Sequence, residues 1–373
     1  MIKERSKKLW QEINKSREKP SAFLITNPKN IFYLSEFCGE GILLSTSEKK
    51  YLITDSRYTE QANQEVRDCQ IIIQELNQVD AQTKSLCTLI SSLNIKEIGF
   101  ESNSLPVSKY LKYQSSMPRL TLHPFENVIE KLRMIKDSHE IELMKRSARI
   151  ATNSFIQTIP SIKNDISELA IAAQLNYNMR KNGAKKEAFD LIVTSGERGT
   201  LIHGEPSTKK IKEGELVIVD FGCIFEMYHS DCTRSFVLGD TGSEKKKLFD
   251  IIKKTQIETL QQVKAGKSCS ELDGFARRII RESGYGDYFS HSLGHGVGLD
   301  IHELPRLSSN DQTILQPGMV VTIEPGIYVP GVGGVRIEDT ILVTEQGCQI
   351  LTLLPKELSI SDYDKEEYND VII

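Results

Sequence analysis

GELVIVDFG at residues 214–222 and GMVVTIEPG at residues 318–326 are two copies of one pattern, which sets the architecture of the second half of the chain. In each copy a Gly precedes an apolar run, a carboxylate stands six residues after that Gly, and another Gly follows two residues later. β-branched residues favour strands, and flanking Gly residues mark turns. Each copy therefore predicts a buried strand that ends in an acidic side chain.

A second acidic segment follows each copy. SDCTRSF places Asp231 two residues before Thr233, and RIEDTIL places Glu338 two residues before Thr340. Because the unit occurs only twice, a fixed-period solenoid is excluded, and the repeat predicts a pseudo-symmetric sheet whose halves face each other. Alternation along VRIED would put Arg336 on the same face of one strand as Glu338.

The four repeated acids are expected where strands face the core. Asp220 and Glu324 each end an apolar run, and an isolated carboxylate buried there costs several kcal/mol unless it is paired or bound to a metal. One such acid alone would indicate an exposed strand end or a salt bridge. Four at matched positions instead indicate a shared cation site.

Histidines cluster beside these acids. HSLGHGVGLDIHELP at residues 291–305 contains His291, His295 and His302, with glycines around the middle histidine that let the backbone approach a site closely. His203, in LIHGEPS, lies just upstream of the first copy. The other histidines are expected to be structural: His123, His139 and His229.

The residue types point to metal-dependent hydrolysis. Four carboxylates and one imidazole can hold two divalent cations if some carboxylates bridge, and oxygen-rich ligation favours Mn²⁺ or Co²⁺ over a thiolate zinc site. Two metals about 3.5–4 Å apart activate a shared water and polarise a carbonyl. The sequence contains no GxxxxGK[ST] phosphate loop, no strand-linked GxGxxG and no GxSxG nucleophile elbow.

The first part of the chain has a different pattern of apolar and polar residues. Short β-rich runs alternate with helix-permissive stretches, which predicts a mixed α/β domain; the runs are AFLIT (22–26), GILLS (41–45), KYLIT (50–54), CQIII (69–73) and EIGFE (97–101). Pro106, Pro118 and Pro124 punctuate the chain after them, and helical periodicity follows over 129–159 and 166–183.

These patterns divide the chain into four parts. We expect an N-terminal domain over 1–125, a linker over 126–137, a catalytic domain over 138–358 and an acidic tail over 359–373.

Composition narrows the partners. The 373 residues carry 47 Lys and Arg against 51 Asp and Glu, a net charge of −4, so no basic field is available to hold nucleic acid or an anionic membrane. The seven cysteines form no CxxC motif, as expected of free thiols in a reducing compartment. The first twenty residues lack a signal-peptide pattern, and no apolar run approaches the roughly 20 residues of a membrane span. We therefore expect a cytoplasmic protein.

The segment from about 136 to 355 resembles the M24-type "pita-bread" metallopeptidases, a group that contains methionine aminopeptidase, aminopeptidase P, prolidase and creatinase. The resemblance lies in IVDFG, SDCTR, HSLGHGVGLDIHELP, TIEPGIY and GGVRIEDT, and is closest to the Xaa-Pro peptidases. LITNPKNIFYLSEFCGEGILL and LITDSRYTEQA resemble the creatinase-type domain that methionine aminopeptidases lack. The resemblance implies an α+β fold, with a duplicated antiparallel sheet preceded by a smaller α/β domain.

The resemblance also implies a dinuclear metal site. It assigns two divalent ions to each chain, with Mn²⁺ expected first and Co²⁺ or Zn²⁺ as alternatives. The implied ligands are Asp220, Asp231, His295, Glu324 and Glu338.

Further roles follow from the same resemblance. His203 is implied to bind substrate and the tetrahedral intermediate, His302 to donate to the scissile carbonyl oxygen, and His291 to line the pocket for the residue after the cut. Glu324 is implied to carry the proton from water to the leaving nitrogen. Arg336 is implied to orient a ligand carboxylate.

The predicted activity is removal of the N-terminal residue from peptides whose second residue is proline, as in Xaa-Pro aminopeptidase. The alternative is an Xaa-Pro dipeptidase (prolidase), since the motifs do not show whether a group blocks the pocket beyond proline or grips its free carboxylate. Relatives that cleave other C–N bonds, and inactive binding modules of this fold, are more remote alternatives, and the five retained ligands disfavour the modules. Relatives with this N-terminal domain are commonly homodimers, which extends that expectation to this chain.

Overall fold

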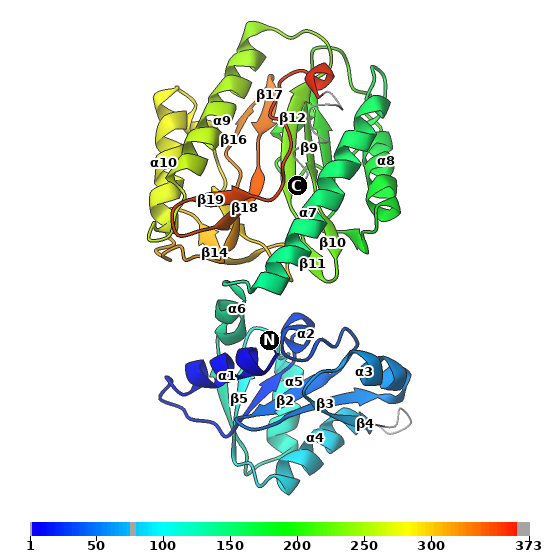
Figure 1. Ribbon diagram of the computed structural model, residues 1–373, viewed down its shortest axis with the longest axis vertical. Coiled ribbons are helices and arrows are strands. Elements are labelled where there is room, and N and C mark those ends of the chain that lie inside the picture. The colour runs from blue at the N-terminus through cyan, green and yellow to red at the C-terminus, as the bar shows by residue number, and fades with distance from the viewer. Residues whose placement is uncertain (1, 75–79, 364–373) are drawn as a thin grey trace. The chain divides into compact units, whose positions relative to one another are not determined.

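The computed structural model of the protein describes residues 2–74 and 80–363 (Figure 1). Contacts divide the chain into two compact units, Met1–Arg133 and Met134–Ile373. The division falls inside the range predicted as a linker, and helix α6 (Val128–Arg133) belongs to the first unit. Most of the predicted acidic tail, residues 364–373, lies outside the described residues.

The first unit is built on a six-stranded mixed sheet. In spatial order its strands are β4 (Gln70–Gln74), β3 (Lys50–Asp55), β2 (Ile42–Thr46), β1 (Ala22–Ile25), β5 (Glu97–Glu101) and β6 (Thr121–Phe125). The five β-rich runs of the sequence correspond to β1–β5. β6 was not predicted because Pro124 lies inside it; the strand pairs in parallel with β5 at the edge of the sheet, where a proline is tolerated.

Helices surround this sheet. Besides α6 they are α1 (Ile2–Ile13), α2 (Pro28–Ser35), α3 (Thr59–Glu65), α4 (Ala81–Ser92) and α5 (Val107–Ser116). Leu86 and Ile90 of α4 and Tyr113 of α5 are buried in one cluster with strand residues such as Leu24 and Ile53. This apolar cluster gives the first unit a core of its own.

The second unit contains both copies of the repeat. The first copy forms β9 (Leu216–Phe221), which pairs antiparallel with β12 (Cys232–Val237), and the second forms β15 (Val320–Ile323), which pairs antiparallel with β18 (Asp339–Val343). VRIED is not a single strand, because β17 (Gly333–Arg336) pairs with β16 (Gly326–Val329) and β18 begins only at Asp339. The remaining strands are β7 (Lys186–Glu187), β8 (Ile192–Ser195), β10 (Cys223–Phe225), β11 (Tyr228–His229), β13 (Gly294–Gly296), β14 (Glu303–Leu307) and β19 (Cys348–Ile350).

Among the described residues of this unit, these strands are covered by helices α7 (Ser138–Thr158), α8 (Glu168–Lys181), α9 (Ser243–Gln262) and α10 (Cys269–Glu282). Figure 1 shows α7 and α8 over one side of the unit and α9 and α10 over the other. The helix predicted over 129–159 is in fact two helices. Asp137 starts α7 with a capping box, in which its side chain accepts from the Glu140 amide and Glu140 reaches back to the Asp137 amide.

Short 3₁₀ helices complete the fold: η1 (Ser56–Tyr58), η2 (Ile159–Ser161), η3 (Gly196–Thr200), η4 (Gly286–Tyr288) and η5 (Ile360–Asp362). Residues 359–363 of the predicted tail pack on the core, where the Tyr363 ring lies against Phe155 and Phe236. Phe155 also stacks on Phe221 of β9, with ring centroids 5.0 Å apart.

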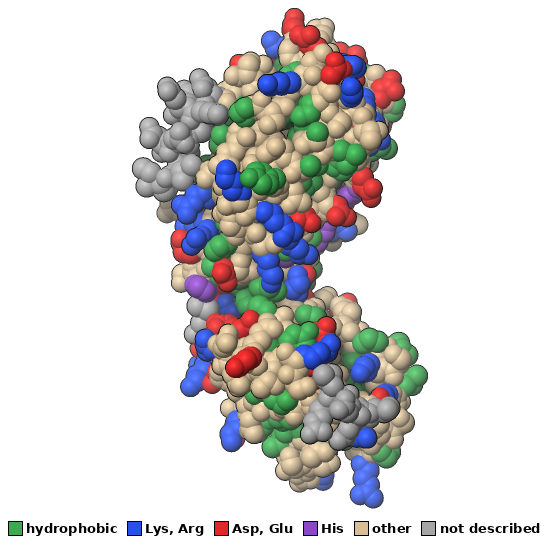
Figure 2. Space-filling model, turned by 90° about the vertical axis from the view of Figure 1, so that its right-hand side faces the viewer, with side chains coloured by type: hydrophobic (Ala, Val, Ile, Leu, Met, Phe, Trp, Pro, Cys, Tyr) green, Lys and Arg blue, Asp and Glu red, His purple; other side chains and the backbone are tan. Residues whose placement is uncertain are grey.

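The cysteines and the charged surface residues can be compared with what the composition led us to expect. All seven cysteines are free. In the described part of the chain, no helix combines the length and the apolar character needed to cross a membrane. Figure 2 shows basic and acidic side chains on both units, as a net charge of −4 leads us to expect.

Candidate metal centre

The four repeated acids form a cluster at matching ends of the two strand pairs. Asp220 lies near the end of β9 and Asp231 directly precedes β12, while Glu324 directly follows β15 and Glu338 directly precedes β18. Antiparallel pairing brings the end of one strand beside the start of its partner. Each strand pair therefore contributes two carboxylates, and we call the four together the carboxylate cluster.

The two repeated threonines cross between the halves. Thr233 Oγ1, from the first half, donates to Glu338 Oε2 at 2.7 Å. Thr340 Oγ1, from the second half, donates to the backbone oxygen of Asp231 at 2.7 Å. The threonine of each half therefore donates a hydrogen bond to the second acid of the opposite half. These two bonds hold Asp231 and Glu338 against the strand pair of the other half.

His295 on β13 completes the cluster. Its Nε2 lies 3.5 Å from Asp231 Oδ2 and 3.5 Å from Glu324 Oε1. Asp231, His295 and Glu338 each offer a ligand atom within 4.8 Å of the others. The His295 Nδ1 lies 2.9 Å from the Gly296 carbonyl oxygen. Because a carbonyl can only accept, Nδ1 carries the proton and the Nε2 lone pair faces the carboxylates.

The glycines around His295 are required by close backbone contacts. A Cβ on Gly294 would lie 2.1 Å from the Thr322 oxygen, and one on Gly296 would lie 2.2 Å from the Leu304 oxygen. Both distances are far shorter than a carbon–oxygen contact allows. The Gly-rich spacing in the sequence therefore reports how tightly β13 is held against its neighbouring strands.

Burial and mutual repulsion place the carboxylate cluster under electrostatic strain. Burial raises the pKa of Asp231 and of Glu338 well above the usual range, and neighbouring carboxylates raise both further. Burial raises the pKa of Glu324 to about 8, a rise that Asp220 increases and Arg336 opposes. Burial also lowers the pKa of His295 to about 4, with a further contribution from His302. The imidazole is thus neutral near pH 7, as a metal ligand must be.

Unpartnered oxygens show that the cluster fits a cation. Asp220 Oδ1 and Glu338 Oε1 are buried, and neither has a hydrogen-bond partner among the described residues. Buried carboxylate oxygens are normally hydrogen-bonded or bound to a metal. Oxygen donors with one neutral imidazole form a donor set suited to divalent ions such as Mn²⁺.

Arg336 orients Asp220 from the end of β17. Its Nη2 donates to Asp220 Oδ2 at 2.6 Å, its Nε donates to Thr233 Oγ1 at 3.1 Å, and its Nη1 donates to Tyr328 Oη at 2.8 Å. The side chain is buried. One oxygen of Asp220 is therefore neutralised by the guanidinium, and the other remains available to a cation.

Three further histidines gather beside the cluster. The His302 ring meets the His295 ring edge-on, with centroids 4.3 Å apart. His291 Nε2 lies 2.9 Å from Tyr328 Oη, and burial holds the pKa of His291 down to about 3. His203 is close enough that its charge adds to burial in lowering the pKa of both His291 and His302.

The histidines expected to be structural have other surroundings. His123 belongs to the first unit, where its Nε2 lies 3.2 Å from Glu97 Oε2. His139 is in the first turn of α7. His229 is buried, and its backbone N–H donates to the Gly298 oxygen at 2.8 Å.

A second buried network lies directly behind Glu338. Arg234 of β12 is fully buried; it donates to the Glu338 backbone oxygen at 2.5 Å, to Asp339 Oδ1 at 2.7 Å and to the backbone oxygens of Leu354 and Pro355. Sequence reasoning assigned it no role, although it stands in SDCTR. We call Arg234, Asp339 and their partners the Arg234 network.

Comparison with known proteins agrees with this arrangement. Residues 142–345 match metallopeptidase family M24, and residues 5–135 match the creatinase/prolidase N-terminal domain. The chain belongs to metallopeptidase family M24. The expected fold is confirmed: a creatinase-type N-terminal domain precedes an M24 catalytic domain of the pita-bread type.

Relatives of this M24 chain match nearly its whole length. The Xaa-Pro dipeptidase of Pyrococcus horikoshii is 38% identical over 360 residues, which cover 96% of this chain and 99% of the relative. The solved structure of an Xaa-Pro dipeptidase from Bacillus anthracis has a TM-score of 0.92 at 37% identity and covers 96% of this chain and 99% of its own. That of an X-Pro aminopeptidase from Thermotoga maritima has a TM-score of 0.86 at 38% identity, with coverages of 91% and 97%.

Family membership and geometry agree on the class of cofactor. M24 metallopeptidases use divalent metal ions, and Asp231, His295 and Glu338 provide a site of suitable donor types in this chain.

Proposed function

We propose that this M24 metallopeptidase is an Xaa-Pro dipeptidase, which hydrolyses the bond before proline in dipeptides. The sequence alone favoured an aminopeptidase and kept the dipeptidase as its alternative. Two relatives that match over nearly their whole length are named Xaa-Pro dipeptidases, which supports the alternative. The aminopeptidase remains the second candidate because one solved relative is named an X-Pro aminopeptidase.

The observation that carries the proposal is a positively charged side chain, that of Arg306, beside the carboxylate cluster. Arg306 on β14 pairs in register with His295 on β13. Its side chain is exposed, and its charge contributes to the pKa shifts of His295, His302 and Glu324, so the guanidinium is within electrostatic reach of all three. A dipeptide ending in proline has a carboxylate one residue past the scissile bond, whereas a longer peptide has a neutral amide there. Arg306 is suited to bind that carboxylate.

The metal ligands proposed are Asp220, Asp231, His295, Glu324 and Glu338, which together would hold two divalent ions, with Mn²⁺ as the first candidate. When bound, such ions activate water and polarise a carbonyl. The clustered acids supply the negative charge that holds them, and Thr233, Thr340 and Arg336 fix the orientation of the acids.

Proton transfer is assigned to Glu324. Thr322 Oγ1 donates to its Oε1 at 3.2 Å, which fixes the orientation of the group. Bound cations would favour the charged carboxylate, which is the form that accepts a proton. Glu324 would accept the proton of the attacking water and deliver it to the proline nitrogen as the bond breaks. The proline nitrogen needs this delivered proton because an amide nitrogen leaves as an amine and not as an amide anion.

The histidines bind and orient the substrate. We assign to His302 a hydrogen bond donated to the scissile carbonyl oxygen as negative charge develops on it, and to His203 the binding of substrate and of the tetrahedral intermediate. His291 is neutral and held by Tyr328. It offers a flat apolar face for the proline ring.

Substrate length tests the proposal. We expect kcat/KM for an Xaa-Pro dipeptide to exceed that for the matching Xaa-Pro-Yaa tripeptide by about 5-fold, since Arg306 is exposed and an exposed charge pair is worth up to about 1 kcal/mol. Arg306→Gln should remove most of this preference by slowing dipeptide turnover alone, and Arg306→Lys should retain part of it. Equal or faster turnover of the tripeptide would instead indicate the aminopeptidase.

Metal content tests the class of protein. We expect about two divalent ions per chain after incubation with Mn²⁺. Fewer than one ion per chain would indicate a binding module that has lost the metal.

A further inference from the structure

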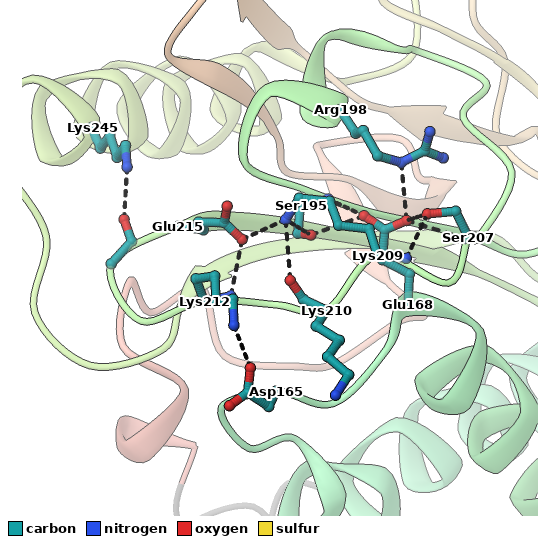
Figure 3. A network of polar contacts seen from close by, with 11 residues as sticks. Asp165, Glu168, Ser195, Arg198, Ser207, Lys209, Lys210, Lys212, Glu215 and Lys245 are labelled. Carbon is teal, nitrogen blue, oxygen red and sulfur yellow. Dashed lines mark hydrogen bonds and ion pairs between the residues drawn. The ribbon is translucent and has the colours of Figure 1, made fainter.

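Glu168, the first residue of α8, has an unusual position outside the metal centre. Its side chain is completely buried. Five donors from one region of the chain converge on its carboxylate (Figure 3): the amide and hydroxyl of Ser195 donate to Oε1, both at 2.8 Å, the amide and hydroxyl of Ser207 donate to Oε2 at 3.1 and 2.7 Å, and Arg198 Nε donates to Oε2 at 3.0 Å. A buried carboxylate needs such compensation, and here it is complete.

The donors come from both ends of one loop. Ser195 ends β8 and Ser207 lies twelve residues later, so residues 196–206 form a loop whose two ends meet on the two oxygens of Glu168. Arg198 spans the same loop internally, because its Nη2 donates to the Glu205 backbone oxygen at 2.6 Å. Glu168 therefore acts as a clasp, and we call residues 196–206 the His203 loop.

The clasped loop carries a predicted site residue. His203 lies on it between the two serines, and a hollow of about 710 Å³ is lined by residues of the loop, including Leu201, His203 and Pro206. Leu201 is about half exposed, at 48%. By holding the two ends of the loop, Glu168 therefore determines the position of the His203 imidazole and of the Leu201 side chain at this hollow.

The same loop is pressed against the strand that presents Arg336. A Cβ on Gly334 of β17 would lie 2.0 Å from the Gly199 oxygen, and a Cβ on Gly199 would lie 2.7 Å from the Gly334 nitrogen. The two backbones are in direct contact with no side chain between them. A movement of the loop would therefore also displace the backbone of β17, the strand that ends at Arg336.

We propose that Glu168 is a positioning residue, a buried clasp that closes the His203 loop and so holds His203 beside His291 and His302. The assignment of a role to His203 rests on the proposed function, whereas the clasp itself does not. Glu168 has no place in the chemistry of the bond that breaks. It acts through the loop.

A carboxylate is needed because all five partners donate. In Glu168→Gln one oxygen becomes an NH₂ group, which would face the donors of either Ser195 or Ser207 and release that end of the loop. Asp165 provides a matched control, since it belongs to the same polar network but pairs with Lys212 Nζ, and within the described residues it has no hydrogen bond to residues 195–207 (Figure 3).

Hydrogen–deuterium exchange of the intact protein tests the clasp without any substrate. We expect amides of residues 196–206 to exchange at least about 10-fold faster in Glu168→Gln than in the wild type, and at the wild-type rate in Asp165→Asn. Ser207→Ala, which removes a single donor, should give a smaller increase in the same segment and serves if Glu168→Gln does not fold. Wild-type exchange of this segment in the variants would overturn the proposal.

A double-mutant cycle tests the link to His203. If Glu168 acts through His203, Glu168→Gln and His203→Ala each lower kcat/KM for an Xaa-Pro dipeptide, by about 10-fold or more, and the double variant is no slower than His203→Ala alone. Multiplied losses would overturn the link. If the wild type cleaves no Xaa-Pro peptide, the proposed function fails, and the exchange measurement still decides on the clasp.

Discussion

Glu338 and Asp339 are neighbours in the chain and both are buried, yet they lie in opposite environments. Asp339, in the Arg234 network, is bound by Arg234 and by Lys356 Nζ at 2.7 Å, and these charges hold its pKa below the usual range although burial alone would raise it. The side chain of Glu338, in the carboxylate cluster, accepts one hydrogen bond from the described residues, that of Thr233, and its pKa is raised well above the usual range by burial and by neighbouring acids.

This difference distinguishes a carboxylate that is neutralised inside the protein from carboxylates that can bind a cation. Both carboxylate oxygens of Asp339 have donors inside the protein, so this side chain is satisfied without a ligand. The carboxylate cluster holds four acids against one arginine, and two of its buried oxygens have no partner in the described ranges. Such a surplus is relieved when a cation binds or when the carboxyls take up protons.

The largest effect is expected from Glu324→Gln in the carboxylate cluster. This change removes both a ligand charge and the proposed proton carrier, so kcat at saturating substrate should fall by about 10³-fold or more. Steady-state kinetics with added Mn²⁺ measures it, with the exposed Glu345→Gln as control. Turnover near the wild-type rate would exclude Glu324 from proton transfer.

Arg234→Met should have the largest effect on stability. It leaves Asp339 as a buried charge without its main partner and removes donors from several backbone oxygens, so the free energy of unfolding should fall by about 3–5 kcal/mol. Urea denaturation of the metal-loaded protein measures this loss. Lys356→Met, which removes a charge nearer the surface, should cost less; equal losses would mean that Arg234 is not the centre of its network.

The metal-free protein should become less stable as pH rises. Asp231, Glu324 and Glu338 have a higher pKa when folded than when unfolded, so their contribution is present below about pH 4 and is lost as pH rises through the folded values, about 8 for Glu324. With chelator, Tm should fall by roughly 3–6 °C between pH 6.5 and pH 8, above the range in which His291 and His295, with their lowered pKa values, make stability rise with pH. Asp339 has the opposite shift, so its contribution is lost only on acidification.

Added Mn²⁺ is the control for this titration, because a bound cation favours the charged carboxylates and should restore Tm most at pH 8. A metal-free Tm that stays constant or rises over this range would contradict the strained cluster.

The smallest effect, and the most direct comparison, comes from neutralising the two neighbours in the metal-free protein. Glu338→Gln removes repulsion and should raise the free energy of unfolding by about 1 kcal/mol, whereas Asp339→Asn breaks a satisfied pair and should lower it. Chemical denaturation in chelator measures both. Changes of the same sign would erase the distinction between the two environments.

Local patterns in the sequence were sufficient to predict β1–β5, the two repeat strands and the grouping of four acids with a histidine-rich segment; the family resemblance then selected His295 from that segment. Strand alternation and repeat spacing are encoded in consecutive residues, so they can be read directly. The break between α6 and α7 also had a local signal in Asp137 and Glu140, but the continuous apolar periodicity around it concealed the break.

Other features depend on tertiary pairing and could not be predicted. The two-residue spacing identified Thr233 and Thr340 but not that each serves the opposite half, because that follows from how the strand pairs meet. Glu168 resembles an ordinary acidic residue in the first turn of a helix, and its partners lie 27 to 39 residues further along the chain. Arg306 gave no signal beyond a charged residue near a proline.

The crossed threonines have a consequence for chimeric enzymes. Exchanging only the segment around 214–237 with that of a relative would join a foreign threonine to the native Glu338, and the native Thr340 to a foreign Asp. Neither graft boundary would break a strand, yet both hydroxyl contacts would have to re-form across unrelated backbones. Functional recombinants should therefore be those that inherit the two halves from the same parent.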